Sequence, residues 1–159
     1  FGFAVDPDAF VRWHFDKSKR RLYLTSEYFG AKTSTDKLAD VIKLSAGREL
    51  VTCDSAEPRM IAELQIRGLQ AVGAKKGPGS IEHSMRWLQE LGEIVIDPNR
   101  CPNAAREFSA YEYERDKYGN FLVEYPDKNN HTIDATRYAM NSVIQNRAAK
   151  TSAGIRRHL

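Results

Sequence analysis

Apolar and polar positions alternate in two neighbouring segments near the start of the chain, which predicts a β-hairpin. Residues 9–16 (AFVRWHFD) and 20–30 (RRLYLTSEYFG) both alternate in this way, and turn-like residues separate them. The apolar run Phe1–Val5 is typical of the remaining part of an earlier strand, and Asp6-Pro7-Asp8 punctuates its end. We therefore expect the domain to begin with antiparallel strands.

In the middle of the chain, helical periods alternate with short apolar runs. One helix is expected after the cap Ser34-Thr35-Asp36 and up to Gly47, a second from Pro58 to Gly68, and a third over residues 80–91. Their predicted buried positions are Leu38, Val41, Ile42 and Leu44, then Met60, Ile61, Leu64 and Ile66, then Ile81, Met85, Trp87 and Leu88. Strands are expected over residues 49–53, 69–74 and 93–96. This alternation predicts parallel strands with helices packed on them.

The last third of the chain has a different pattern. Residues 111–125 (YEYERDKYGNFLVEY) alternate on both sides of Lys117-Tyr118-Gly119-Asn120, which predicts a second, late β-hairpin. Asn129 or Asn130 can cap a final helix that runs to about Arg147. Its available core residues are Ile133, Met140, Val143 and Ile144. We expect one domain over residues 1–147 and a basic tail or linker over residues 148–159.

Composition narrows the class of protein. A chain of 159 residues with 42% apolar content can bury one sizeable core. It has no apolar run of about 20 residues and no signal-peptide pattern, so we expect a soluble intracellular protein without a membrane partner. Cys53 and Cys101 lack zinc-site spacing and are expected to be buried thiols. A net charge of +3 permits a nucleic-acid partner without arguing for one.

Two acidic positions are candidates for chemistry. Asp54 follows an expected strand, and ligands of open α/β sheets bind outside the carboxyl ends of strands. Alternatively, Asp54 or Ser55 caps the next helix. Asp134 lies in the first turn of the last helix, with His131 on the same face, so this pair can hold a metal ion or a water molecule. Acids are also common in first helical turns because of the helix dipole, and this alternative stays open.

Basic and aromatic side chains are candidates for contacts with nucleic acid. Lys75 and Lys76 lie in a glycine-rich turn just before the helix that begins near Ser80, where they can meet DNA phosphates or remain simply solvated. No GxxxxGK[ST] motif occurs, so this chain carries no Walker A loop. The aromatic residues of the late hairpin can stack on bases, but covering the core is the favoured interpretation; they are Tyr111, Tyr113, Tyr118, Phe121 and Tyr125.

Four separated stretches together resemble the nuclease domain of phage large terminases. They are FGFAVDPDA at residues 1–9, DSAEP at 54–58, GAKKGPGSI at 73–81 and NNHTIDATRYA at 129–139. They occur in the family's order and span nearly the whole chain. The resemblance implies a ribonuclease H-like α/β fold, with a central mixed sheet that starts antiparallel, continues parallel and is flanked by helices. The late β-hairpin is an addition to that fold.

The resemblance also implies a metal site. Members of the family use three carboxylates to bind two divalent ions, Mg²⁺ or Mn²⁺. The second carboxylate corresponds to Asp54 and the third to Asp134, and His131 matches a histidine beside the third. The first is expected immediately before Phe1, so no residue of this chain matches it, which puts the activity of the chain as given in doubt. Asp6 and Asp8 match the Asp-Pro turn of the family instead of a ligand.

The function implied is that of an endonuclease that cuts double-stranded viral DNA during genome packaging, in the cytoplasm of the infected bacterium. Implied partners are an N-terminal ATPase domain of the same parent protein, the small terminase subunit and the portal protein. Two alternatives remain open. One is another ribonuclease H-like nuclease, such as a Holliday-junction resolvase. The other is a non-catalytic nucleic-acid-binding module whose acids are helix caps.

Overall fold

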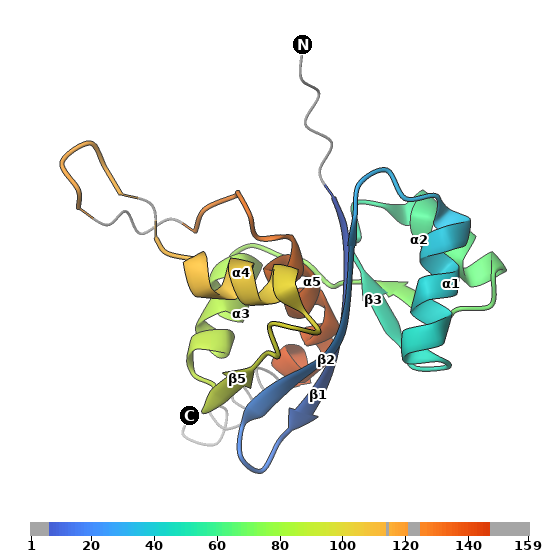
Figure 1. The fold of residues 1–159 in the computed structure, drawn as a ribbon, viewed down its shortest axis with the longest axis horizontal. Helices are drawn as coiled ribbons and strands as arrows, with labels where there is room; N and C mark the ends of the chain where they lie inside the picture. The colour runs from blue at the N-terminus through green and yellow to red at the C-terminus, as the bar shows by residue number, and fades with distance from the viewer. Residues whose placement is uncertain (1–6, 114, 121–124, 147–159) are drawn as a thin grey trace, which may run out of the picture.

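A computed structural model describes residues 7–113, 115–120 and 125–146. Two long antiparallel strands, β1 (Asp8–Asp16) and β2 (Arg21–Gly30), run through the middle of the molecule (Figure 1). The carboxylate of Asp16 accepts hydrogen bonds from the backbone N–H groups of Ser18 and Lys19 and so closes the turn between the strands. The predicted first hairpin is therefore confirmed.

On one side of this hairpin lie α1 (Thr35–Ala46), β3 (Val51–Cys53), α2 (Pro58–Ile66) and β4 (Ala71–Gly73). The strands β3 and β4 pair in parallel. The apolar faces of both helices cover these strands in one core cluster, which contains Leu38, Ala39, Ile42, Ala46, Val51, Cys53, Leu64, Leu69 and Ala71. In this half of the molecule, the carboxyl end of β3 leads directly to the candidate metal centre.

On the other side lie α3 (Ser80–Gln89), β5 (Glu93–Val95), α4 (Pro102–Ala110) and α5 (His131–Ala139). Met140 is the C-cap of α5, and residues 141–146, directly after it, are helical as well. Strand β5 pairs with β2 in parallel. The buried members of this second cluster are Leu22, Met85, Trp87, Leu88, Ile133, Met140 and Ile144.

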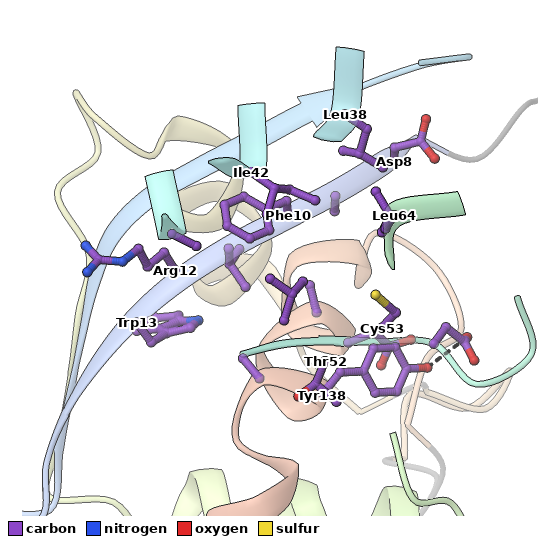
Figure 2. A pocket seen from close by; sticks show the side chains of 18 of the residues that line it. Asp8, Phe10, Arg12, Trp13, Leu38, Ile42, Thr52, Cys53, Leu64 and Tyr138 are labelled. Carbon is purple, nitrogen blue, oxygen red and sulfur yellow. Dashed lines mark hydrogen bonds between the residues drawn. The ribbon is translucent and has the colours of Figure 1, made fainter. Parts of the chain in front are cut away.

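The expected α/β class, with an antiparallel start and a parallel continuation, is confirmed. Within the described residues the strands form two sheets, one in the order β1-β2-β5 and one of β3 and β4. Between them is a cavity of about 370 Å³, lined by β1, β3, α1, α2 and α5 (Figure 2). The site described below lies along this cavity, between the two sheets.

Three predicted core positions are wrong, because Leu44, Ile66 and Ile81 are 90%, 82% and 54% exposed. In α1 the buried face is Leu38, Ala39, Ile42 and Ala46. Leu44 follows Ile42 by two positions, which turns its side chain to the opposite face of the helix. Ile66 and Ile81 lie at the ends of α2 and α3, where the apolar stripe no longer meets the core.

Helix α4 was not predicted from the sequence. The late hairpin was predicted, and the described residues cover only part of it. The turn of this hairpin is present, because the carbonyl of Asp116 accepts a hydrogen bond from the backbone N–H of Gly119, and the backbone N–H of Asp116 donates to the carbonyl of Asn120. The phenol rings of Tyr113 and Tyr125 pack together, 5.2 Å apart. Residues 121–124 of the expected second strand, Phe1–Val5 and the tail at 148–159 lie outside the described residues.

Both thiols are buried and free, as the sequence suggested. Burial, with the nearby charge of Asp54, raises the pKa of Cys53 to about 11. Among the helices of the described part of the chain, none combines the length and the apolar character needed to cross a membrane.

Buried hydrogen bonds from β1 and α4 fix the start of α5. The carboxylate of Glu107, itself buried, accepts from the backbone N–H of Thr132 at 2.7 Å and from its hydroxyl at 2.5 Å. The N-cap residue Asn130 makes no side-chain capping bond, so Glu107 supplies an acceptor for an otherwise unpaired N–H of the first turn. From β1, the indole N–H of Trp13 donates to the hydroxyl of Thr136 at 2.9 Å. These contacts set the position of α5 along β1.

The first prediction concerns the core. Leu22 is completely buried, so Leu22→Ala should lower the free energy of unfolding by about 2–5 kcal/mol through lost burial and the cavity left behind. Leu44→Ala, the same change at an exposed position, should change it by about 0.5 kcal/mol or less. Urea denaturation followed by circular dichroism measures both. Equal losses for the two variants would contradict the assignment of Leu22 to the core and of Leu44 to the surface.

The second prediction concerns the anchor of α5. Glu107→Ala removes the acceptor of two buried donors and should lower the free energy of unfolding by about 2–4 kcal/mol. Glu82→Ala, which breaks an exposed ion pair with Arg86 on α3, should cost about 0.5 kcal/mol or less. Both are read by urea denaturation. A loss for Glu107→Ala no larger than that of the control would show that α5 does not depend on this cap.

Candidate metal centre

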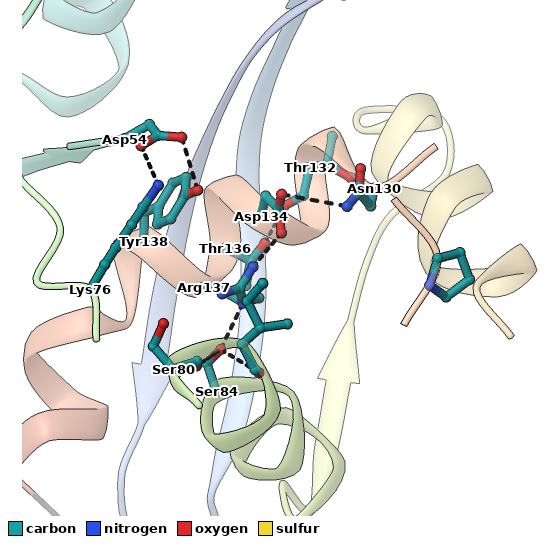
Figure 3. Close-up of polar contacts among 12 residues, drawn as sticks. Asp54, Lys76, Ser80, Ser84, Asn130, Thr132, Asp134, Thr136, Arg137 and Tyr138 are labelled. Carbon is teal, nitrogen blue, oxygen red and sulfur yellow. Dashed lines mark hydrogen bonds and ion pairs between the residues drawn. The ribbon is translucent and has the colours of Figure 1, made fainter. Parts of the chain in front are cut away.

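Asp54 follows β3 directly and makes a tight local turn. Its Oδ1 atom accepts from the backbone N–H of Ala56 at 2.8 Å. Helix α2 begins later, at Pro58, and its N-cap residue Glu57 makes no side-chain capping bond. Asp54 therefore is not the cap of α2, and its carboxylate faces α5 instead (Figure 3).

Two side chains from other elements meet the Asp54 carboxylate. The ammonium group of Lys76, from the turn after β4, forms an ion pair with Oδ1. The hydroxyl of Tyr138, on α5, donates to Oδ2 at 3.1 Å. The Lys76 nitrogen also lies over the Tyr138 ring, 5.2 Å from its centre. Three segments far apart in the sequence thus converge at Asp54 (Figure 3).

These contacts keep Asp54 ionised. Partial burial acts to raise the pKa of Asp54, but hydrogen bonds from Lys76, Ala56 and Tyr138 outweigh it and lower that pKa below its usual range. The Asp54 side chain is 36% exposed, so it is open to a ligand from solvent. An ionised, accessible carboxylate is the form in which Asp54 can bind a cation.

Asp134 lies one helical turn before Tyr138 on α5. Its Oδ1 accepts from Arg137 at 2.5 Å, and the Arg137 side chain, 8% exposed, also donates through Nε to the hydroxyl of Ser84 at 2.6 Å. Burial raises the pKa of Asp134 despite the opposing charge of Arg137, and the charges of Asp127 and Asp54 add to the rise. A further cation near Asp134, in addition to Arg137, would act against this rise in pKa.

The three predicted site residues lie along one cavity. Asp54, Asp134 and His131 all line the cavity between the two sheets, and the Asp54 charge is near enough to affect the pKa of Asp134. The imidazole of His131 packs edge-on against the ring of Phe29, 6.0 Å away. His131 and Asp134, three positions apart on α5, both line this cavity.

The predicted basic turn is anchored. Asn141 accepts from the Lys75 backbone N–H at 3.0 Å and donates to its carbonyl at 3.1 Å. The turn is one wall of a small cleft of about 60 Å³ whose basic lining residues are Lys75, Lys76, His83 and Arg137. Lys76 therefore lies between this cleft and Asp54, instead of in a freely solvated turn.

Sequence reasoning missed three contributors to the site, namely Tyr138, Arg137 and Asn141. A signal for two of them was present, because Arg137 and Tyr138 follow Asp134 by three and four positions and so share its helix face. Both also lie in the NNHTIDATRYA stretch. Nothing in the local sequence indicated that Asn141 would bind the backbone of Lys75.

The donor groups fit a hard divalent cation in part. Carboxylate oxygens are the ligands that Mg²⁺ and Mn²⁺ prefer, and Asp54 and Asp134 supply them to one cavity. Within residues 7–113, 115–120 and 125–146, no group of three or more His, Cys, Asp or Glu side chains is close enough to hold a metal ion. Asp54 and Asp134 thus occupy two of the three positions at which the family resemblance implies a carboxylate.

Comparison with known sequences identifies the family. The family model described as "Terminase RNAseH like domain" matches residues 1–142. The large terminase subunit of Bacillus phage SPP1 is 49% identical over 142 residues, which cover 87% of this chain and 34% of that protein. The large terminase subunit of phage PBSX from Bacillus subtilis is 32% identical, covering 89% and 33%. The chain thus spans about a third of the length of these relatives.

Solved structures agree with this assignment. The crystal structure of the SPP1 large terminase nuclease domain with bound Mn is similar with a TM-score of 0.81 and 49% identity, covering 88% of this chain and 81% of that one. The P22 large terminase nuclease domain shares the fold with a TM-score of 0.63 and 18% identity, over 89% of this chain and 77% of that one. The family model, the sequence relatives and the fold together show that this chain belongs to the terminase RNase H-like domain family and is homologous to the nuclease domain of large terminases.

Proposed function

We propose that this domain cuts double-stranded DNA in a reaction that requires divalent metal ions, as the nuclease part of a large terminase that packages viral genomes. The observation that carries the proposal is the convergence of Asp54 and Asp134 on one cavity, through the contact between Tyr138 and Asp54. Family membership favours a terminase nuclease over the junction resolvase that the sequence left open. A non-catalytic module whose acids are helix caps is disfavoured at Asp54, because Asp54 does not cap α2.

Asp54 and Asp134 are the proposed ligands of two ions, Mg²⁺ or Mn²⁺, together with the aspartate that the family pattern places before Phe1. Two such ions activate a water molecule and stabilise the leaving oxygen of a phosphodiester. The Mn bound in the SPP1 nuclease domain supports the use of a divalent ion here. The pKa of Asp54 is lowered and its partner Lys76 is far more exposed than Arg137, so Asp54 is the more readily available ligand of the two.

The remaining residues of the site have supporting roles. His131, at the cavity beside Asp134, is placed to orient a water molecule or a phosphate, or to accept a proton. Lys75 and Lys76, on the anchored turn, supply positive charge for the DNA backbone. Tyr138 fixes the Asp54 carboxylate from α5 and thereby holds the two halves of the site in register.

The first proposed partner is an ATPase domain of the same parent protein. The large terminase subunits of SPP1 and PBSX are about three times as long as the matched region, which is in keeping with an additional ATPase domain in the parent protein. We further propose that the small terminase subunit and the portal protein are partners, and that the protein acts in the cytoplasm of the infected bacterium.

The third prediction tests the nuclease assignment. In a protein that includes the aspartate expected before Phe1, Asp54→Asn and Asp134→Asn should each lower the rate of Mn²⁺-dependent cleavage of plasmid DNA by about 100-fold or more, because each removes a ligand charge. The cleavage rate is measured on agarose gels from samples taken at successive times. Calorimetric titration should show that both variants bind Mn²⁺ more weakly.

Asp40→Asn is the matched control, since Asp40 is an exposed aspartate on α1, away from the cavity. It should cut and bind Mn²⁺ as the unchanged protein does. Circular dichroism establishes that all three variants are folded. Undiminished cleavage by a folded Asp54→Asn or Asp134→Asn protein would reject the assignment of that residue.

A further inference from the structure

The two site carboxylates pair with different cations, and these cations differ in how firmly they are held. Asp134 is paired with Arg137, which is 8% exposed and is held a second time by Ser84 of α3. The hydroxyl of Ser84 is in turn fixed by the carbonyls of Ser80 and Ile81. The Arg137 guanidinium is therefore locked in place and cannot leave Asp134 without losing a buried hydrogen bond.

Asp54 is paired with a cation that is far less constrained. The Lys76 side chain is 41% exposed, and its polar contacts with the described residues include the Asp54 carboxylate and the hydroxyl and ring face of Tyr138. An ammonium group on a flexible four-carbon chain moves more easily than a forked guanidinium. An exposed ion pair of this kind adds little to stability, so a divalent cation can displace it.

A second position for the Lys76 charge lies next to the first. Lys76 also lines the small cleft that Lys75, His83 and Arg137 border, and Tyr138 is shared between the cleft and Asp54. A concentration of basic side chains around a cleft suits an anion such as a DNA phosphate. While Lys76 pairs with Asp54, its charge is compensated and contributes little to such an anion.

From this geometry we propose that Lys76 is a displaceable counterion that couples metal binding to DNA binding. In the metal-free protein Lys76 neutralises Asp54. When a divalent ion takes the Asp54 carboxylate, the ammonium group is released into the adjacent cleft, where it meets a DNA phosphate. This inference rests on the proposed function, because it takes Asp54 as a metal ligand. By thermodynamic linkage, metal must then strengthen DNA binding, and DNA must strengthen metal binding.

The fourth prediction compares Lys76→Met with Lys75→Met, which removes a neighbouring charge of the same sign and leaves the Lys75 backbone bonds to Asn141 in place. Without DNA, Lys76→Met should bind Mn²⁺ about twofold to fivefold more tightly than the unchanged protein, because no cation has to be displaced. Lys75→Met should change Mn²⁺ affinity much less. Isothermal titration calorimetry, in the protein that includes the aspartate expected before Phe1, measures both affinities.

DNA binding provides the second readout. Fluorescence anisotropy with a short labelled duplex is measured without metal and with Ca²⁺, and gels verify that the duplex stays uncut. With Ca²⁺, the dependence of log affinity on log salt concentration should be shallower for Lys76→Met by about 0.9, the loss of one phosphate contact. Without metal, the slopes of Lys76→Met and the unchanged protein should agree. Lys76→Gln repeats both measurements with a polar side chain of similar length.

The outcomes separate the two proposals. If Lys76→Met and Lys76→Gln lower the slope equally with and without metal, or leave Mn²⁺ affinity unchanged, Lys76 is an ordinary surface cation and the coupling is wrong, while the nuclease assignment stands. If Asp54→Asn binds Mn²⁺ as tightly as the unchanged protein, Asp54 is not a metal ligand and the proposed function itself fails.

Discussion

The contact of α5 with both β1 and β3 is the constraint on which the rest of the site depends. Trp13 of β1 holds α5 through Thr136, and Tyr138 on the same helix reaches across to Asp54 at the end of β3. Helix α4 adds the third fixed point, since the buried Glu107 caps the first turn of α5. Because His131, Asp134 and Tyr138 share one face of a helix that is fixed at three points, the position of α5 determines which groups face Asp54 across the cavity.

The sequence predicted the elements whose buried residues form a regular apolar pattern within the element itself. The alternation in residues 9–30 is sufficient to predict β1 and β2. Each strand turns one face toward a core and pairs with the other strand through backbone hydrogen bonds. Helix α4 escaped prediction because its buried residues are Ala104 and the acidic Glu107, which give no apolar stripe. Leu44 was misplaced for a related reason: a leucine adds to an apparent stripe whichever side of the helix it occupies. Hydrophobic periodicity thus indicates where apolar residues are, and a helix that packs through polar contacts gives a weak signal.

At the site, the sequence and the family resemblance indicated Asp54, Asp134 and His131, and the fold brings all three to one cavity. The partners of these residues could not be predicted in the same way. Lys76 approaches Asp54 because β4 pairs in parallel with β3, which brings the turns that follow the two strands to the same edge of the sheet. Asn141 then fixes this turn from a third segment. Such tertiary pairings depend on sheet register and helix placement, which no local pattern records.

A cluster of acids is costly in a folded protein unless cations are near it, and this domain meets that cost in two ways. Arg137 is a buried partner of Asp134 that Ser84 holds a second time, although desolvation still raises the pKa of Asp134. Lys76 is a far more exposed partner at Asp54, a carboxylate of similar exposure. Two locked cations would hold the carboxylates so firmly that a metal ion would have to break buried bonds at both, whereas two mobile ones would leave the metal-free fold short of compensating charge. One of each kind leaves Asp54 as the carboxylate from which a cation is most easily exchanged.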